Sequence, residues 1–313
     1  MQPLDRVVAV LLAPLVLLAA LRLVPLDESF PLVALEAEIA WLMVPAWLAL
    51  GWAVLRRSRA LAAMAMLPVG VHAFLLVTAV GGAVTWFPRD GVSMRIVAAN
   101  VLAWNERSEE LARELAGTDA DVMTITELTP EWVAVLEREG VLAQFPHRVI
   151  VPRDDCFGIA LLSRPPIVEH EVVDLGGVPM ITAVLALDGR RVRVNAVHTL
   201  PPRERAYTTV WRAQMIALRA RIDPRESTIV AGDLNASPFA RSYRALLSAG
   251  LRGAHESVGR GLAPTWPNGL MPVPPMRLDH VLVTGSIDVL EVREGVGAGS
   301  DHRPVIADLS IAG

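Results

Sequence analysis

The chain has 313 residues, 53% of them hydrophobic, with a mean hydropathy of +0.42 and a formal net charge of −4. All 29 basic residues are Arg, and the single cysteine, Cys156, excludes an internal disulfide and a metal site built from several cysteines. The first 90 residues hold six Arg and six acidic residues, so the negative charge lies beyond them, and no basic tract favours tight, non-specific binding to duplex nucleic acid.

Three hydrophobic blocks occupy the first 87 residues. Val7–Leu21 and Ile39–Leu55 are uncharged, and Ala60–Phe87 is long enough to cross a bilayer with tilt. A cleaved signal peptide is the weaker interpretation of the first block, because no clear small-residue cleavage site precedes Arg22 and two more apolar blocks follow. We therefore predict three transmembrane helices.

The loops between the blocks predict the orientation. Arg56, Arg57 and Arg59 lie between the second and third blocks, whereas acidic residues and only Arg22 lie between the first and second. The positive-inside rule places the arginine-rich loop and the N-terminus in the cytoplasm. Residues 1–90 are then a membrane anchor, and residues 91–313 form a domain outside the cytoplasm.

After the linker Pro88–Ser93, apolar periodicity predicts a mixture of strands and helices. Strands are expected at Arg95–Val101, Val122–Thr126, His147–Val151, Gly158–Ser163, Ile167–Val173, Val178–Leu187, Arg191–Val197, Thr228–Ala231, Leu278–Val283 and Pro304–Leu309. Helices are expected at Arg107–Leu115, Pro130–Glu139, Arg203–Arg221 and Arg241–Ala249. Because many strands follow one another directly, the sheets should be mixed, with helices on their outer faces.

Polar residues lie at or beside the ends of several of these strands. They are Asn100, Glu127, His198, Asp233, Asn235, Asp279, Asp301 and His302. Each one alone also suits a turn, a strand end or a half-buried structural role. Together they form an oxygen-rich set that suits a hard divalent cation such as Mg²⁺ or Mn²⁺.

The segments around these residues resemble, in the same order, the motifs of the endonuclease/exonuclease/phosphatase superfamily. They read AANVLAWN, TITEL, FGIALLSR, VNAVHTLPP, VAGDLNASP, RLDHVLV and GSDHRPV. The superfamily includes deoxyribonucleases, exonuclease III-like repair enzymes, neutral sphingomyelinases and inositol polyphosphate 5-phosphatases. The resemblance covers about Met94–Leu309 and implies a four-layered α/β sandwich, with two mixed β-sheets face to face and helices outside.

The resemblance also implies how the carboxylates and amides act in a phosphoester hydrolase. Glu127 would hold Mg²⁺ or Mn²⁺, with Asn100 and Asp301 completing the metal site directly or through water. Asp233 would orient or deprotonate the attacking water. Asn235 would bind a phosphate oxygen or position that water.

The remaining candidates would contact the phosphate or the leaving group. His302 resembles the phosphate-binding imidazole, held in its cationic form by Asp279, and His198 would stabilise the transition state or protonate the leaving oxygen. Arg164 and Arg203 are weaker candidates for substrate binding, because ordinary surface arginines are more common. The reaction implied is in-line attack of water on a phosphoester.

Two departures lean away from abasic-site repair. Leu102 stands where the exonuclease III-like branch often has an acid, and His198 stands where that branch tends to have Tyr. Nucleic acid, a phospholipid headgroup and an inositol phosphate remain open as substrates. A non-catalytic, membrane-tethered binding module on the same fold is the alternative, and the lipid bilayer is the expected partner, with no obligate protein partner inferred.

Overall fold

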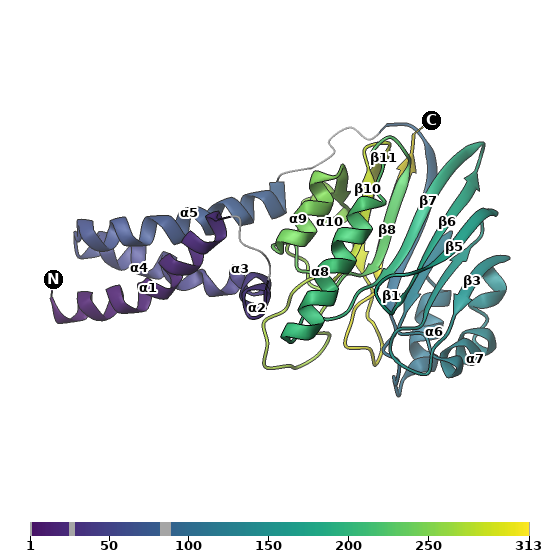
Figure 1. The fold of residues 1–313 in the computed structure, drawn as a ribbon, viewed down its shortest axis with the longest axis horizontal. Coiled ribbons are helices and arrows are strands. Elements are labelled where there is room, and N and C mark those ends of the chain that lie inside the picture. The colour runs from purple at the N-terminus through teal and green to yellow at the C-terminus, as the bar shows by residue number, and fades with distance from the viewer. Residues whose placement is uncertain (1, 25–28, 82–88, 313) are drawn as a thin grey trace.

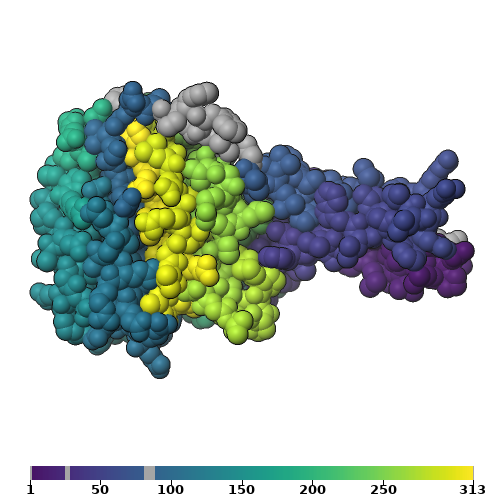
Figure 2. All heavy atoms as spheres, turned by 180° about the vertical axis from the view of Figure 1, so that it is seen from behind, coloured from purple at the N-terminus to yellow at the C-terminus, as the bar shows by residue number. Residues whose placement is uncertain are grey.

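The structure, a computed structural model, describes residues 2–24, 29–81 and 89–312. A rod of helices projects from a larger α/β domain, and the two form one continuous surface when seen from behind (Figures 1 and 2). The helices of the rod and its base are α1 Pro3–Leu23, α2 Leu32–Ala37, α3 Ile39–Leu42, α4 Val44–Leu55 and α5 Arg59–Gly81.

Two of these helices, α1 and α5, are long and apolar enough to cross a membrane, by length and composition. Large apolar side chains lie on their outward faces: Val10, Leu11 and Val77 are 72%, 67% and 66% exposed. The end of the third predicted block, residues 82–87, lies outside the described residues.

The second predicted span is not a single long helix. Its segment, Ile39–Leu55, is divided at Met43 into α3 and α4, because Pro45 in the first turn of α4 has no N–H group to continue the preceding helix. The whole segment is also shorter than α1 or α5 and lies at the lower end of the roughly 17–25 residues that a spanning helix needs. The described part of the chain therefore contains two candidate spans by length, where the sequence predicted three.

The larger domain is built on two six-stranded mixed sheets, with strand orders β11-β12-β1-β2-β4-β3 and β5-β6-β7-β8-β10-β9. The first sheet contains β1 Val92–Asn100, β2 Val122–Thr126, β3 His147–Val151, β4 Ile159–Ser163, β11 Ile287–Glu294 and β12 Val305–Ile311. The second contains β5 Ile167–Asp174, β6 Pro179–Leu187, β7 Arg190–His198, β8 Thr228–Asp233, β9 Leu251–Gly253 and β10 Asp279–Thr284. Each sheet has one parallel pair, β1 with β2 and β7 with β8, among antiparallel neighbours.

The main core lies between the two sheets, where inward-facing apolar residues of both meet. Ile96, Leu161, Val194 and Val281 are among its fully buried members. Apolar residues of α6 Ser108–Ala116 and α7 Pro130–Arg138 pack on the outer face of the first sheet, and those of α8 Arg205–Ala220 and α9 Arg241–Ser248 pack on that of the second. The predicted sandwich of two mixed sheets with helices outside is confirmed.

Two strands, β9 and β11, lie outside the predicted set, and both are at sheet edges. β9 has only three residues. β11 carries four charged residues and a bulge between Val289 and Glu291 that interrupts its alternation. Edge strands tolerate charges and bulges because one side of each strand is unpaired, so their hydrophobic signal is weak.

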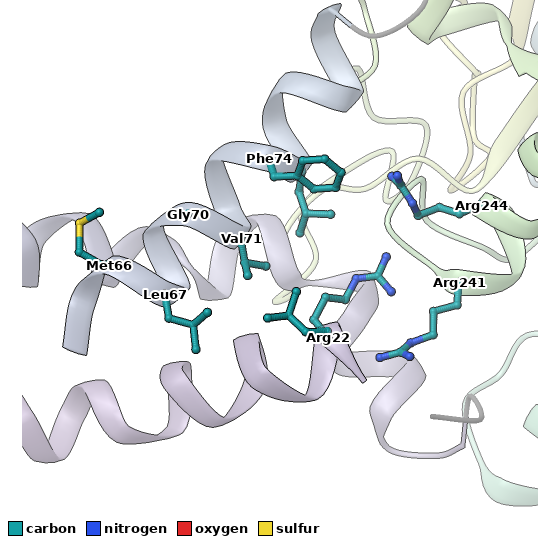
Figure 3. A pocket seen from close by; sticks show the side chains of 10 residues that line it. Arg22, Met66, Leu67, Gly70, Val71, Phe74, Arg241 and Arg244 are labelled. Carbon is teal, nitrogen blue, oxygen red and sulfur yellow. The ribbon is translucent and has the colours of Figure 1, made fainter. Parts of the chain in front are cut away.

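Two arginines fasten the rod to the domain. Arg22, in the last turn of α1, donates to the carbonyl oxygen of Phe239 at 2.7 Å, and Arg241 of α9 donates to the carboxylate of Glu36 at 2.6 Å and to the carbonyl oxygen of Leu21 at 2.8 Å. Figure 3 shows both guanidinium groups beside a cavity of about 570 Å³ between the rod and the domain. These bonds satisfy carbonyls at the end of α1 and hold α2 in place against the domain.

Candidate active site

Three neighbouring strands of the second sheet carry the centre of the site. The parallel register of β7 and β8 sets His198 opposite Asp233, and the antiparallel register of β8 and β10 sets Asp279 opposite Asp233. Side chains that are directly opposite on neighbouring strands point to the same face. All three are therefore gathered at one end of the sheet, where each is at most 3% exposed.

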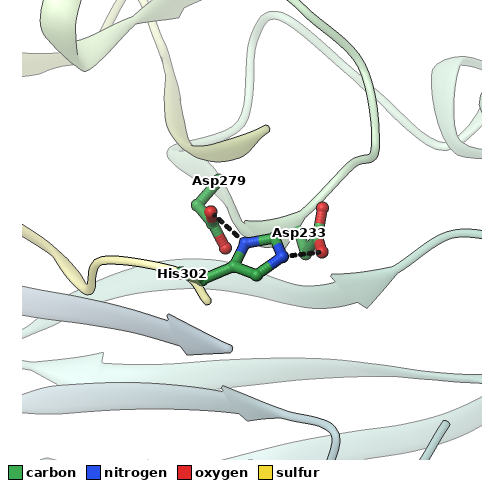
Figure 4. A group of neighbouring side chains, drawn as sticks. All are labelled: Asp233, Asp279 and His302. Carbon is green, nitrogen blue, oxygen red and sulfur yellow. Dashed lines mark hydrogen bonds and ion pairs between the residues drawn. The ribbon is translucent and has the colours of Figure 1, made fainter. Parts of the chain in front are cut away.

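His302 lies between two of these carboxylates (Figure 4). Its Nδ1 is 2.7 Å from Oδ2 of Asp279, and its Nε2 is 3.8 Å from Oδ2 of Asp233. Burial disfavours a charged ring, but the charges of Asp279 and Asp233 outweigh it and raise the pKa of His302 to about 10. The ring is therefore cationic at neutral pH. Although the three side chains are close enough to surround an ion, an imidazolium has no free lone pair to offer a metal.

His198 has the opposite charge state. Burial, followed by the charge of His302, lowers the pKa of His198 to about 4, so its ring is neutral at pH 7. Its Nε2 is 3.8 Å from Oδ2 of Asp233, and its Nδ1 has no hydrogen-bond partner among the described residues. The Phe157 ring packs against it, with the ring centroids 5.3 Å apart. This neutral ring can donate one hydrogen bond to a bound group.

Asn100 and Glu127 come from the ends of the parallel strands β1 and β2 in the other sheet. The Asn100 side-chain amide donates to Oε1 of Glu127 at 3.0 Å and to Oδ2 of Asp233 at 3.1 Å, and it thereby joins the two sheets. Burial raises the pKa of the Glu127 carboxyl, and the charge of Asp301 adds to the rise. The N–H of Ala103, 3.0 Å from Oε2, opposes it.

An unpaired carboxylate oxygen of Asp301 also indicates that the site suits a cation. Its Oδ2 accepts a hydrogen bond from Nε1 of Trp266 at 3.1 Å, whereas its Oδ1 is buried and has no hydrogen-bond partner in the described part of the chain. An unpaired buried carboxylate oxygen is costly unless it has a ligand. With Glu127 and Asn100 nearby, the donor set is made of oxygens, as Mg²⁺ and Mn²⁺ prefer. The residues present therefore fit the expected divalent metal.

The turns that present these groups have an uncommon backbone conformation. Leu102, Glu127 and Asn235 have positive φ angles of 58°, 60° and 45°. Such angles cost free energy for residues other than glycine and are concentrated at functional sites. At Asn235 the cost is offset locally: its N–H donates to Oδ1 of Asp233 at 2.8 Å and its side-chain amide to the carbonyl of Thr199 at 2.9 Å. The Asn235 amide is thereby fixed beside Asp233.

The site opens into a cavity of about 730 Å³. The predicted site residues that line it are Glu127, His198, Arg203, Asp233, Asn235, Asp301 and His302. Asn100 and Asp279 are almost fully buried and support this surface through their bonds to Glu127 and His302. The guanidinium of Arg203 lies 5.2 Å from the ring of Tyr207.

Arg164 does not join the site. β2 and β4 are antiparallel, and Val122 pairs with Ser163, so Arg164 follows at the strand end opposite Glu127. Its guanidinium lies 2.8 Å from the carboxylate of Asp119. A strand of five residues separates the two ends by about 16 Å, which is why this predicted substrate contact is not supported.

Several residues of the cavity were not predicted from the sequence. Trp104 and Phe157 line it, and so does the segment 30–38 around α2. The hydroxyl of Thr265 supports Asp279 by accepting its backbone N–H at 3.1 Å. Trp104 and Phe157 lie within the motif sequences, and this position could have indicated that they are close to the site. The apolar residues of α2 lie next to a hydrophobic block, so their composition pointed to the membrane anchor.

Comparisons with known proteins concern the family and the fold of the chain. The sequence profile described as the Endonuclease/Exonuclease/phosphatase family matches residues 91–302. A comparison with curated protein sequences finds no match.

Solved structures share the fold. An endonuclease/exonuclease/phosphatase protein from Beutenbergia cavernae DSM 12333 has 20% sequence identity and a TM-score of 0.59, over 71% of this chain and 72% of that one. D. rerio TDP2, solved in complex with a single strand DNA product, has 17% identity and a TM-score of 0.58, over 70% of this chain and 99% of that one. A Bacteroides vulgatus endonuclease/exonuclease/phosphatase has 15% identity and a TM-score of 0.58, over 70% and 99%.

Proposed function

The chain belongs to the endonuclease/exonuclease/phosphatase family, and from this we propose that it is an Mg²⁺- or Mn²⁺-dependent phosphoester hydrolase held in a membrane, with its active site outside the cytoplasm. One observation carries the proposal. Strand ends of both sheets bring a buried carboxylate, Asp233, within 4 Å of a cationic and a neutral imidazole, beside the cation-binding oxygens of Glu127 and Asp301.

The residues divide the work of in-line hydrolysis between them. Glu127, Asp301 and Asn100 would hold a divalent cation, which would supply Lewis-acid stabilisation of the charge on the phosphoryl oxygens. Asp233 orients the attacking water and accepts its proton, with Asn235 fixed beside it. The new P–O bond forms on the water oxygen as the P–O bond to the leaving oxygen breaks, and the released alkoxide takes a proton from solvent water.

The two imidazoles take different parts because their charges differ. The cationic ring of His302, held by Asp279, stabilises the negative charge that develops on the phosphoryl group. The neutral ring of His198 donates a hydrogen bond to that group. The resemblance of the motifs implied that His198 would stabilise the transition state or protonate the leaving oxygen. A neutral imidazole is a very weak acid, so hydrogen bonding to the phosphoryl group is the role that fits the burial of His198.

Removal of the metal tests the enzyme proposal directly. We expect the full chain in detergent micelles to hydrolyse bis(4-nitrophenyl) phosphate with Mn²⁺ or Mg²⁺ and to lose this activity with EDTA, reversibly. Changes beside a metal ligand typically weaken metal affinity by about 10–100-fold, so Glu127→Gln should raise the half-saturating Mn²⁺ concentration at least that much. Glu131→Gln, at an exposed carboxylate in α7, is the matched control. Turnover that is insensitive to EDTA would refute the metal-dependent reaction.

The arrangement of the rod supports a three-pass anchor. The N-terminal end of α1 and the end of α4 lie together, with Nε1 of Trp52 3.2 Å from Oδ1 of Asp5, at the end of the rod away from the domain (Figure 1). α1 ends and α5 leaves at the domain side, so α3 and α4 together run along the rod between them. Arg56, Arg57 and Arg59 then share the far end with the N-terminus, which the positive-inside rule assigns to the cytoplasm.

Reporter fusions test this topology. Alkaline phosphatase is active only outside the cytoplasm, and green fluorescent protein exported through the general secretion pathway is dark. We expect a C-terminal phosphatase fusion to be active and a C-terminal fluorescent fusion to be dark. Truncation and fusion after Arg57 should give the opposite pair of results. A fluorescent full-length fusion without phosphatase activity would contradict the proposed location.

A further inference from the structure

We propose that the substrate is a membrane lipid phosphoester whose apolar chain lies against α2, so that the segment 30–38 forms one wall of the active site. This inference rests on the proposed hydrolase function and names its substrate class. The segment lies outside residues 91–302, which carry the family motifs.

The cavity has a polar floor and an apolar wall. The floor holds the catalytic residues described above. The wall includes Phe30, Val33, Ala34 and Ala37, and the cavity is also lined by Trp104, Phe157, Val273, Met276 and Leu278. A single phosphoester group on the floor would leave its attached alcohol beside the wall, and an apolar alcohol would gain free energy there by leaving water.

The wall is held firmly by contacts to the domain. Val33 is 3% exposed and belongs to the apolar cluster on the outer face of the second sheet. Glu36 pairs with Arg241, as described above, and Nε1 of Trp41 in α3 donates to the carbonyl oxygen of Pro275 at 3.1 Å. α2 is therefore a preformed part of the cavity.

The charges around the cavity disfavour a nucleic-acid strand. Arg203 is the one permanently cationic residue among the described residues that line it, whereas Glu38, Glu127, Asp233 and Asp301 are acidic. Proteins that bind nucleic-acid strands without sequence preference use a positively charged groove that follows successive phosphates. A substrate with one phosphate group and an apolar chain matches this lining better.

The position of the wall gives a membrane lipid access to the cavity. α2 lies at the base of the rod, directly after the candidate span α1 (Figure 1). Trp41, which follows it, is 50% exposed, and Leu270 and Met271 in the loop that reaches Pro275 are also exposed. Exposed tryptophan and large apolar residues beside spanning helices are typical of the membrane interface.

Two substrates with the same reacting group test the proposal. 4-Nitrophenyl butyl phosphate and 4-nitrophenyl dodecyl phosphate differ only in the length of the apolar chain. The ratio of their kcat/KM values, dodecyl over butyl, is measured for the full chain in nanodiscs with Mn²⁺. Partitioning of the dodecyl ester into the bilayer affects every variant equally, so differences in this ratio between variants report on the cavity.

Adjacent residues of α2 provide a matched pair of variants. Ala34 lines the cavity, whereas Leu35, 39% exposed, is absent from its lining. Because an amide is costly to bury against an apolar chain, Ala34→Gln should lower the dodecyl-to-butyl ratio by about tenfold or more. Leu35→Gln should keep the ratio of the unaltered protein. If Ala34→Gln lowers the melting temperature, Ala37→Gln at the same wall replaces it.

The outcomes separate this inference from the function on which it rests. The lipid inference would be wrong if the dodecyl-to-butyl ratio of kcat/KM were the same for Leu35→Gln as for Ala34→Gln or its replacement Ala37→Gln. That result would leave the hydrolase function unaffected. Faster cleavage of a single-stranded oligonucleotide than of the dodecyl ester would also overturn it. If neither ester is hydrolysed by the protein with Mn²⁺ or Mg²⁺, the hydrolase function fails and the inference fails with it.

Discussion

Asp233→Asn should lower kcat for phosphodiester hydrolysis by about 10²–10⁴-fold, the range expected when a general base is lost. The substitution keeps the size of the side chain and an oxygen that can accept the N–H of Asn235. It removes the negative charge that lies 3.8 Å from both His198 and His302. Burial and the charge of Asp279 raise the pKa of Asp233, which makes its carboxylate a stronger base than a free one.

The measurement is steady-state hydrolysis of bis(4-nitrophenyl) phosphate at saturating Mn²⁺, together with thermal unfolding to confirm that the variant is folded. Asp223→Asn is the control, because Asp223 lies outside the cavity and pairs with the exposed Arg225. If Asp233→Asn retained activity within a few-fold of the unaltered protein, another group would have to handle the water. The binding-module alternative predicts no turnover in either protein.

Arg277→Met should lower the free energy of unfolding by about 3–5 kcal/mol, because it leaves a buried carboxylate without its cation. Arg277 is 2% exposed and Glu256 is 6% exposed, and the two form a close ion pair. Arg277 also donates to the carbonyl oxygen of Gly261 at 2.8 Å, and Tyr243 donates to Glu256 at 3.1 Å. The arginine thus anchors the loop that leads to Asp279.

Thermal and denaturant unfolding of the full chain in detergent would measure this loss. The double variant Arg277→Met with Glu256→Leu should recover part of it, because no unpaired charge then stays buried. Arg225→Met removes an exposed arginine from a surface pair and should leave the melting temperature unchanged. An Arg277→Met protein as stable as the Arg225→Met protein would show that the buried pair contributes little.

The strands of the domain were largely predictable because both faces of most of them are buried. β2 and β3 have the predicted bounds, and β4 and β6 start one residue later than expected. β2, β4 and β6 are mainly apolar, buried segments that end at turns, so local composition identifies them. The edge strands β9 and β11 and the division of Ile39–Leu55 were missed, because they depend on charge, bulging and a proline more than on apolar periodicity.

Local sequence was enough to predict which polar side chains lie at or beside strand ends. Asp233 was predicted to follow the strand residues Ile229 and Val230, with Gly232 directly before it. In the structure, β7 approaches Gly232 so closely that a Cβ atom on Gly232 would lie 2.0 Å from the carbonyl oxygen of Val197. Local apolar patterning and turn residues are enough to set such positions.

How those side chains act together depends on the folded arrangement of the two sheets. His198 and His302 are the same residue type, yet one ring is neutral and the other cationic, because their charge states depend on carboxylates brought together by the sheet register. Arg164 lies at the strand end opposite Glu127, and α2 lines the cavity. Neither position was predicted, because both depend on packing between segments that are far apart in the chain. Electrostatics and enclosure arise from neighbours in space, which local sequence does not specify.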